Sequence, residues 1–213
     1  MGNKTYAKNL NIKSNDINYP QLINSSKDNI EKYSALKEDE FHELFQHHKH
    51  ADIEERIILT VLKEIQEGKD AELYKPSKYD EDFKVHIMVG LPRSGKSTIV
   101  KDLDIPVMNP DTIRLVYHGQ RFFAPAEPKI WEAAQRIVDR FRTIGISDIV
   151  IDATNTNAGR RNMWKMYNNE FHVLRTPIEE CINRAIKTNQ EDLIPVIKNM
   201  AAKWDYDDTY KDI

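Results

Sequence analysis

The sequence contains a single cysteine, no long apolar segment and no excess of positive charge. Cys181 has no second cysteine with which to form an internal disulfide bond, which fits a reducing compartment. No apolar run approaches the roughly 18 residues that a membrane-spanning helix needs, and the N-terminus lacks the apolar core of a signal peptide. We therefore expect a soluble, cytoplasmic protein with no membrane segment.

The charges are nearly balanced. The formal net charge at pH 7 is −3. Residues 1–80 contain 12 basic and 15 acidic residues, whereas residues 81–213 contain 19 of each. Because no overall basic field is present, binding of a nucleic acid would have to depend on a local patch of positive charge.

Length and patterning predict one α/β core preceded by an extension. Residues 1–30 are rich in Asn, Lys, Ser and Asp, which predicts a loosely held arm. Apolar residues recur at helical spacing from 34 to 68 and predict two amphipathic helices, followed by a linker at 69–82. We expect an N-terminal extension of residues 1–80, which is a candidate surface for a protein partner or for self-association, and a second domain of residues 81–213.

Short apolar runs alternate with helical patterns after residue 84. The expected strands are 85–89, 106–108, 148–152 and 171–174. The expected helices are 96–103, 111–117, 127–144, 159–167, 177–187 and 195–203. Strands separated by helices predict a parallel sheet with helices on both faces, which places the second domain in the α/β class.

A phosphate-binding loop lies between the first of these strands and the helix that follows. Residues 90–97 match the pattern GxxxxGK[ST] in full, and glycines at both ends let successive N–H groups point at phosphate oxygens. Lys96 would reach the β- and γ-phosphates of ATP, and Ser97 would offer its hydroxyl to Mg²⁺. The residues predicted to bind the nucleotide are Gly90, Leu91, Pro92, Arg93, Ser94, Gly95, Lys96, Ser97 and Thr98.

A carboxylate and a guanidinium follow the second strand. Asp111 and Arg114 lie three residues apart where a helix is expected to begin, at the edge where open parallel sheets bind ligands. Phosphoryl transfer to an alcohol needs a base aimed at the hydroxyl and cations that hold the phosphates. This pair could supply both, although Asp111 could instead serve as the helix N-cap.

Three sequence blocks resemble the 5′-hydroxyl polynucleotide kinase family of P-loop kinases. They are GLPRSGKST at 90–98, NPDTIR at 109–114 and IVIDATNTNAGRR at 149–161, in the order and at a spacing similar to those of the family. A looser match at 179–200 is similar to a lid helix and the helix after it. The resemblance covers roughly residues 84–204. It implies an adenylate-kinase-like P-loop NTPase fold and transfer of the γ-phosphate of ATP to 5′-hydroxyl ends of DNA or RNA.

The same resemblance implies roles for individual residues. Lys96 and Ser97 would hold ATP and Mg²⁺, and Asp111 would be the general base on the 5′-hydroxyl. Arg114 would contact the acceptor phosphate or the reacting oxygens, and Arg184 would clamp the donor phosphates from the lid. Further along, Asp152 would lie near the metal ion and Thr154 would line the acceptor channel.

Several basic and aromatic residues allow two interpretations. Arg160 and Arg161 open a helix, where they could meet a nucleic-acid phosphate or be solvated. A second lid arginine of the family is replaced near Lys187, which could substitute as a point charge. An aromatic and basic cluster after the Asp111 helix could stack on single-stranded nucleic acid, although packing on the sheet edge is the favoured interpretation. The cluster consists of Tyr117, Arg121, Phe122 and Phe123.

Two alternative functions remain open. The first is a P-loop kinase that acts on a small-molecule hydroxyl, which the neutral charge of residues 81–213 favours. The second is an ATP-gated binding module in which residues 1–80 contact a partner. Asp111 and Arg114 argue against this second alternative, because a pure switch needs no acceptor base.

Overall fold

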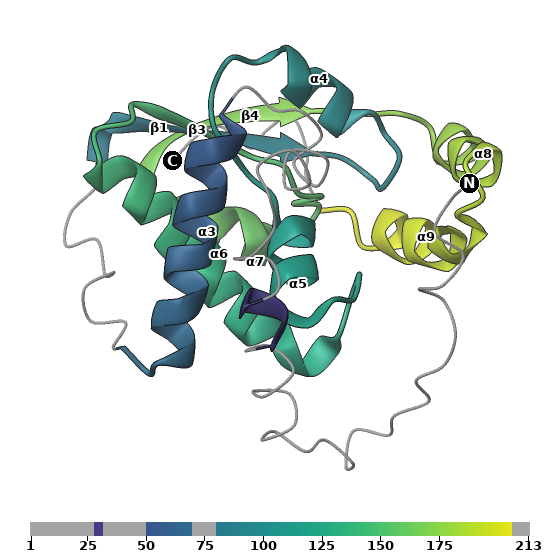
Figure 1. Cartoon of the computed structure of the whole chain (residues 1–213). Coiled ribbons are helices and arrows are strands. Elements are labelled where there is room, and N and C mark those ends of the chain that lie inside the picture. Colours follow the sequence, from purple (N-terminus) through teal and green to yellow (C-terminus); the bar gives the residue numbers. More distant parts are fainter. Residues whose placement is uncertain (1–27, 32–49, 70–79, 206–213) are drawn as a thin grey trace.

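The structure is a computed structural model that describes residues 28–31, 50–69 and 80–205 (Figure 1). The strands are β1 (Asp80–Val89), β2 (Val107–Met108), β3 (Asp148–Ile151) and β4 (Tyr167–Val173). The α-helices are α3 (Ala51–Gln66), α4 (Lys96–Asp102), α5 (Pro110–His118), α6 (Glu127–Thr143), α7 (Ala158–Arg161), α8 (Ile178–Lys187) and α9 (Ile194–Ala202). Short 3₁₀ turns occur at Ala124–Ala126, Asn162–Trp164 and Glu191–Leu193.

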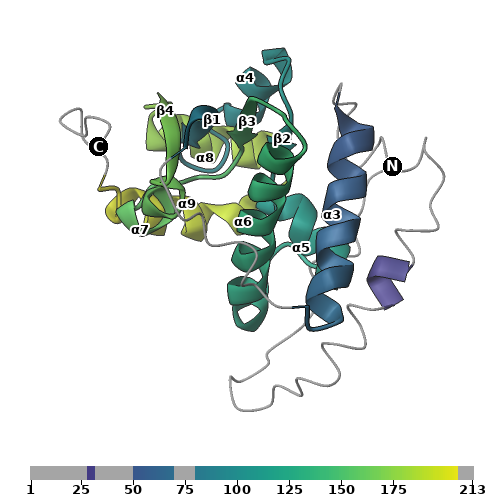
Figure 2. The ribbon, with the colours of Figure 1, turned by 90° about the vertical axis from the view of Figure 1, so that its left-hand side faces the viewer.

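The four strands form one parallel sheet in the order β2-β3-β1-β4. Figure 2 shows the strands side by side in this order, with α4 on one side of the sheet and α5 and α6 on the other. The predicted α/β fold with a parallel sheet is therefore confirmed. Because β1 lies between β3 and β4, the loop that leaves its carboxyl end begins at the centre of the sheet edge.

Strand β1 is buried on both faces. Its Val85, Ile87 and Val89 join the large core that also contains the inner side of α6, whereas Met88 packs on the opposite face with Val100 of α4. The predicted inner residues of α6 are all fully buried: Ile130, Ala133, Ala134, Ile137, Val138 and Phe141. The near-continuous apolar run of β1 is the pattern expected of a central parallel strand.

Helix α3 confirms the second of the two predicted N-terminal helices and packs against the sheet domain. Its buried apolar residues belong to the same core cluster as β1 and α6, and Figure 2 shows α3 beside α6. Glu54 of α3 is buried, and its Oε1 accepts a hydrogen bond of 2.7 Å from the backbone N–H of Val107 in the edge strand β2. The domain boundary near residue 80 stays a prediction.

The other predictions for the N-terminal extension can be compared with the structure only in part. The first predicted helix lies almost entirely outside the described residues. Within the predicted arm, residues 28–31 form a helical turn, and Ile30 is buried in the main core rather than loosely held.

The helix expected at 159–167 is wrong in its second half. Helix α7 ends at Arg161, a 3₁₀ turn follows, and Tyr167 already belongs to β4. The apolar residues that suggested a longer helix serve the core instead, because Trp164 is fully buried and the Tyr167 ring packs edge-to-face on that of Phe83 in β1, with the ring centres 5.4 Å apart.

Over the described ranges, no helix is both long and apolar enough to cross a membrane.

Candidate active site

The phosphate-binding loop leaves β1 and leads into α4, as predicted. Gly95 precedes α4 with a φ of 105°, and Arg93 has a φ of 66°, a value that non-glycine residues rarely adopt. A Cβ atom at Gly90 would lie 2.6 Å from Ser94 Oγ. A side chain at position 90 would therefore displace the Ser94 hydroxyl, and glycine is favoured conformationally at position 95.

Lys96 lies over the concave side of this loop. Its side chain is buried, and Nζ donates hydrogen bonds to the carbonyl oxygens of Gly90 at 3.1 Å and Leu91 at 2.8 Å. Burial lowers the pKa of Lys96, while the nearby carboxylates of Asp152 and Asp111 act in the opposite direction. A buried cation held by carbonyl oxygens can be offered to phosphate oxygens without first breaking an ion pair.

Ser97 and Asp152 lie side by side next to Lys96. Ser97 Oγ donates to Asp152 Oδ2 at 2.8 Å, and Asn109 Nδ2 approaches the same oxygen at 3.5 Å. Burial raises the pKa of Asp152, although the hydrogen bond from Ser97 and the charge of Lys96 oppose this shift. A hydroxyl and a carboxylate are the oxygen ligands that Mg²⁺ prefers, so this pair fits the predicted metal site.

The loop is supported by the segment after β3. Gly90 N–H donates to the carbonyl oxygen of Thr154 at 2.9 Å, and the buried Asn155 donates from Nδ2 to the carbonyl oxygen of Met88 at 2.8 Å. Asn155 has a φ of 44°, which asparagine tolerates better than most residues. The sequence analysis did not single out Asn155, although its place in the Thr-Asn block could have indicated a special turn.

Asp111 and Arg114 lie on the first turns of α5, at the carboxyl edge of the sheet. The N-cap of this helix is Asn109, whose side chain accepts a hydrogen bond of 2.8 Å from Asp111 N–H. The Asp111 carboxylate is therefore not needed as the cap, and its side chain is 73% exposed. Arg114 Nη1 donates to Asp111 Oδ1 at 2.5 Å, which fixes one oxygen and leaves the other toward solvent.

Glu127, at the start of α6, holds the other side of Arg114. Its two oxygens accept hydrogen bonds of 2.7 and 2.8 Å from Arg114 Nε and Nη2, and Oε2 also accepts one of 3.1 Å from Trp131 Nε1. The sequence analysis missed Glu127, because no local spacing connects residues 13 positions apart on different helices.

Arg160 and Arg161, which are adjacent in the sequence, face different surroundings. The Arg160 guanidinium lies 3.9 Å from the centre of the Trp131 ring, so it extends the network of Arg114 and Glu127. Arg161 is 1% exposed, and donates to the carbonyl oxygen of Asn155 at 3.1 Å and to Asp205 at 2.7 Å. Arg161 thus supports the chain itself, and its predicted contact with substrate stays a prediction.

Arg184 reaches the loop from α8. Its Nη1 lies 3.3 and 3.2 Å from the carbonyl oxygens of Arg93 and Ser94, and Nε donates to Glu180 at 2.7 Å. Leu91 of the loop packs in a small apolar cluster with residues of α8 and α9, which lie together at one side of the sheet in Figure 1. Lys187 is exposed on the same helix.

The aromatic cluster after α5 divides into packed and exposed members. Tyr117 is buried and Phe123 packs on the core, as the favoured interpretation predicts. Phe122 is 61% exposed, with its ring centre 5.9 Å from the Arg114 guanidinium carbon. Arg121 pairs with Asp192 at 2.9 Å.

Comparisons with known proteins give one family and partial likenesses to solved structures, among them the following two. A family model described as AAA domain matches residues 85–195. No curated protein matches the chain. A chain of "Structure of Pnkp1/Rnl/Hen1 complex" is 27% identical with a TM-score of 0.44, over 51% of this chain and 40% of that chain. A chain of "Structure of the Pnkp1/Rnl/Hen1 RNA repair complex" is 18% identical with a TM-score of 0.46, over 62% of this chain and 49% of that chain.

The chain thus spans less than half the length of either of these two relatives. The family match, by contrast, covers just over half of the present chain and runs from β1 through the phosphate-binding loop to the start of α9. It confirms the predicted P-loop fold, and the chain belongs to this AAA domain family of nucleotide-binding P-loop proteins.

Proposed function

We propose that the protein is an ATP-dependent kinase that transfers the γ-phosphate to the 5′-hydroxyl end of DNA or RNA. The observation that carries this proposal is the placement of Asp111. Its carboxylate is exposed at the sheet edge, and Asn109, which accepts the Asp111 N–H at 2.8 Å, also reaches the buried Asp152 beside Ser97 at 3.5 Å. An acceptor held by Asp111 would therefore lie close to phosphates held by the loop.

The loop supplies the donor side of the reaction. Backbone N–H groups of Gly95, Lys96 and Ser97, at the amino end of α4, would bind the phosphates of ATP. Lys96 would exchange the carbonyl oxygens of Gly90 and Leu91 for phosphate oxygens, and Arg184 would add a second cation from α8. Ser97 and Asp152 would hold Mg²⁺, which when bound neutralises charge on the β- and γ-phosphates.

Asp111 supplies the acceptor side. It would accept the proton of the 5′-hydroxyl while that oxygen forms a bond to the γ-phosphorus and the bond from that phosphorus to the leaving oxygen of ADP breaks. The products are a 5′-phosphorylated end and ADP, and the proton passes from the exposed Asp111 to water. Arg114 keeps Asp111 in place, and its remaining N–H groups are free to contact acceptor oxygens.

Two further side chains could contact a nucleic-acid acceptor. The exposed Phe122 lies beside the Arg114 guanidinium that holds Asp111, and Arg160 lies over Trp131, which binds the Glu127 partner of Arg114. Phosphates near the 5′ end would contact Arg160, and the Thr154 segment would line the channel. Stacking of a base on Phe122 would tolerate any sequence.

The deciding experiment is transfer of labelled γ-phosphate from ATP with Mg²⁺ to short 5′-hydroxyl DNA and RNA oligonucleotides, with 5′-phosphorylated oligonucleotides as controls. We expect label only on the 5′-hydroxyl ends. Absence of label together with intact ATP binding would contradict the proposal. It would favour a small-molecule acceptor or an ATP-gated module that binds a partner through residues 1–80.

A further inference from the structure

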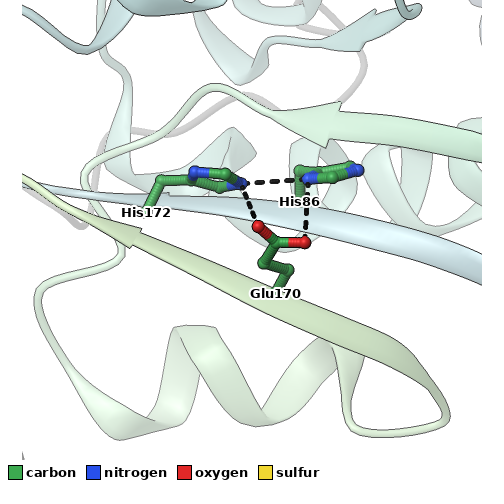
Figure 3. Close-up of side chains that lie close together, drawn as sticks. All are labelled: His86, Glu170 and His172. Atoms are coloured by element: carbon green, nitrogen blue, oxygen red, sulfur yellow. Dashed lines mark hydrogen bonds and ion pairs between the residues drawn. The ribbon is translucent and has the colours of Figure 1, made fainter.

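Two histidines and a glutamate meet on the face of the sheet that also carries Met88. His86 of β1 is paired in register with Glu170 of β4, and His172 follows Glu170 by two residues, so all three side chains point to the same side. Figure 3 shows the Glu170 carboxylate directed at the two imidazole rings. The sequence does not reveal this group, because 86 residues separate the histidines.

The distances suit a transition-metal ion. His86 Nδ1 lies 2.9 Å from His172 Nε2, and the two Glu170 oxygens lie 3.8 and 3.6 Å from these nitrogens. Metal–ligand bonds of about 2.0–2.2 Å at tetrahedral angles put neighbouring ligand atoms roughly 3.3–3.5 Å apart. Each observed separation is within about half an ångström of this value, and small side-chain rotations can correct it.

The second nitrogen of His86 also has a suitable partner. His86 Nε2 lies 3.6 Å from Asp148 Oδ1 of the neighbouring strand β3. A metal-ligating histidine commonly directs its other N–H to a carboxylate, which fixes the ring orientation. Asp148 would thus leave Nδ1 of His86 with its lone pair toward His172 and Glu170.

We propose that His86, Glu170 and His172 bind a divalent transition-metal ion of the Zn²⁺ type, which ties the edge strand β4 to the central strand β1. Nitrogen ligands separate this site from the oxygen-rich pair of Ser97 and Asp152, which suits Mg²⁺. Lys84 forms an ion pair with Glu170, so its ammonium group competes with the metal for this carboxylate.

The test is titration of chelator-treated full-length protein with ZnCl₂ in the presence of excess Mg²⁺. Calorimetry measures the number of sites and the affinity, and thermal unfolding measures the Tm. Four further histidines lie between residues 42 and 50, so the comparison is made in a His47→Gln/His48→Gln background, which keeps the cluster intact. We expect one site and, at Zn²⁺ concentrations near 100 times Kd, a rise in Tm of about 5–10 °C.

Variants in and next to the cluster should change the affinity for Zn²⁺ in opposite directions. His172→Ala and Glu170→Gln should abolish the site and the Tm shift, whereas Lys84→Gln should tighten binding by up to about fivefold, because it frees Glu170. Equal Zn²⁺ affinity in the background protein and in His172→Ala would overturn the proposal, as would absence of binding in the background protein. Circular dichroism of each variant without metal establishes that the variant is folded.

Discussion

Arg114 and Glu127 form a bidentate ion pair that joins the middle of α5 to the start of α6. Both side chains are largely buried, and the same arginine holds Asp111 through its third nitrogen. Glu127 therefore sets the position of the proposed base through Arg114, although it does not itself approach the loop. This makes Glu127 a positioning residue in the proposed reaction.

Glu127→Gln should reduce kcat for phosphoryl transfer by about tenfold or more, because charged hydrogen bonds of this kind are each worth about 1.5–3 kcal/mol. The KM for ATP should change little. Glu81→Gln, at the exposed amino end of β1, is the matched control and should retain full activity. A normal kcat for Glu127→Gln in steady-state assays would show that Arg114 does not need this partner.

The same ion pair predicts a dependence of stability on pH. Burial alone would raise the pKa of Glu127, but the hydrogen bonds and charge of Arg114 outweigh it, so the pKa is lowered on folding. Glu127 thus stabilises the fold above its unfolded pKa, and this contribution is lost as the pH falls through the lower, folded pKa. Urea unfolding should show that the stability difference between wild type and Glu127→Gln shrinks from about pH 7 to about pH 3.5. A constant difference would contradict the lowered pKa.

Asp111→Asn should slow transfer by about 10²- to 10⁴-fold, because it removes the general base, and should leave ATP affinity nearly unchanged. Asp102→Asn, at the exposed end of α4, makes the same chemical change away from the sheet edge and should be neutral. Single-turnover transfer and nucleotide binding are measured in parallel. Wild-type transfer rates in Asp111→Asn would show that Asp111 is not the general base.

Ser97→Ala and Asp152→Asn should each raise the Mg²⁺ concentration needed for half-maximal transfer, and chelation of Mg²⁺ should stop the reaction. Since Ser97 and Asp152 are hydrogen-bonded, the double variant should be less impaired than the two single effects combined. Thr143→Ala, a hydroxyl removed from the end of α6, serves as control. An unchanged Mg²⁺ dependence in both single variants would contradict this site.

Arg184→Ala should reduce transfer strongly, and Arg184→Lys should restore little, because the single nitrogen of a lysine cannot replace both Nε, which binds Glu180, and Nη1, which reaches the loop carbonyls. Lys187→Ala tests whether the exposed lysine three positions later replaces a lid arginine. We expect a smaller loss there, measured as kcat/KM for ATP. The reverse order of effects would assign the clamp to Lys187.

Asp205→Ala should lower the free energy of unfolding by roughly 2 kcal/mol, because it removes the charged hydrogen bond between Asp205 and the buried Arg161 guanidinium. Arg160→Ala should change stability much less and should instead weaken oligonucleotide binding. Denaturant unfolding and fluorescence anisotropy separate the two effects. Equal destabilisation by both variants would contradict the different surroundings of these neighbouring arginines.

These two arginines also show where sequence reasoning ends. The loop at 90–98, the position of Asp111 and the parallel sheet could be predicted, because strand, glycine and cation patterns act over a few adjacent residues. The direction of Arg161 could not, because it depends on Asp205, 44 positions later.

Other features that the sequence did not predict have the same cause. The contact of Glu127 with Arg114 depends on how α5 packs against α6. The length of α7 is determined by burial of Trp164 rather than by helix propensity. Long-range packing overrides local preference at these places.

The contact between Glu54 and the backbone of Val107 closes one hydrogen-bonding position at the edge of the sheet. Strand β2 is an edge of the described sheet, and unpaired N–H groups at an edge are sites where another chain can add a strand. A carboxylate delivered from α3 occupies one such donor, and the helix covers the neighbouring apolar residues. Helix α3 thereby blocks one backbone donor through which another chain could add a strand to β2.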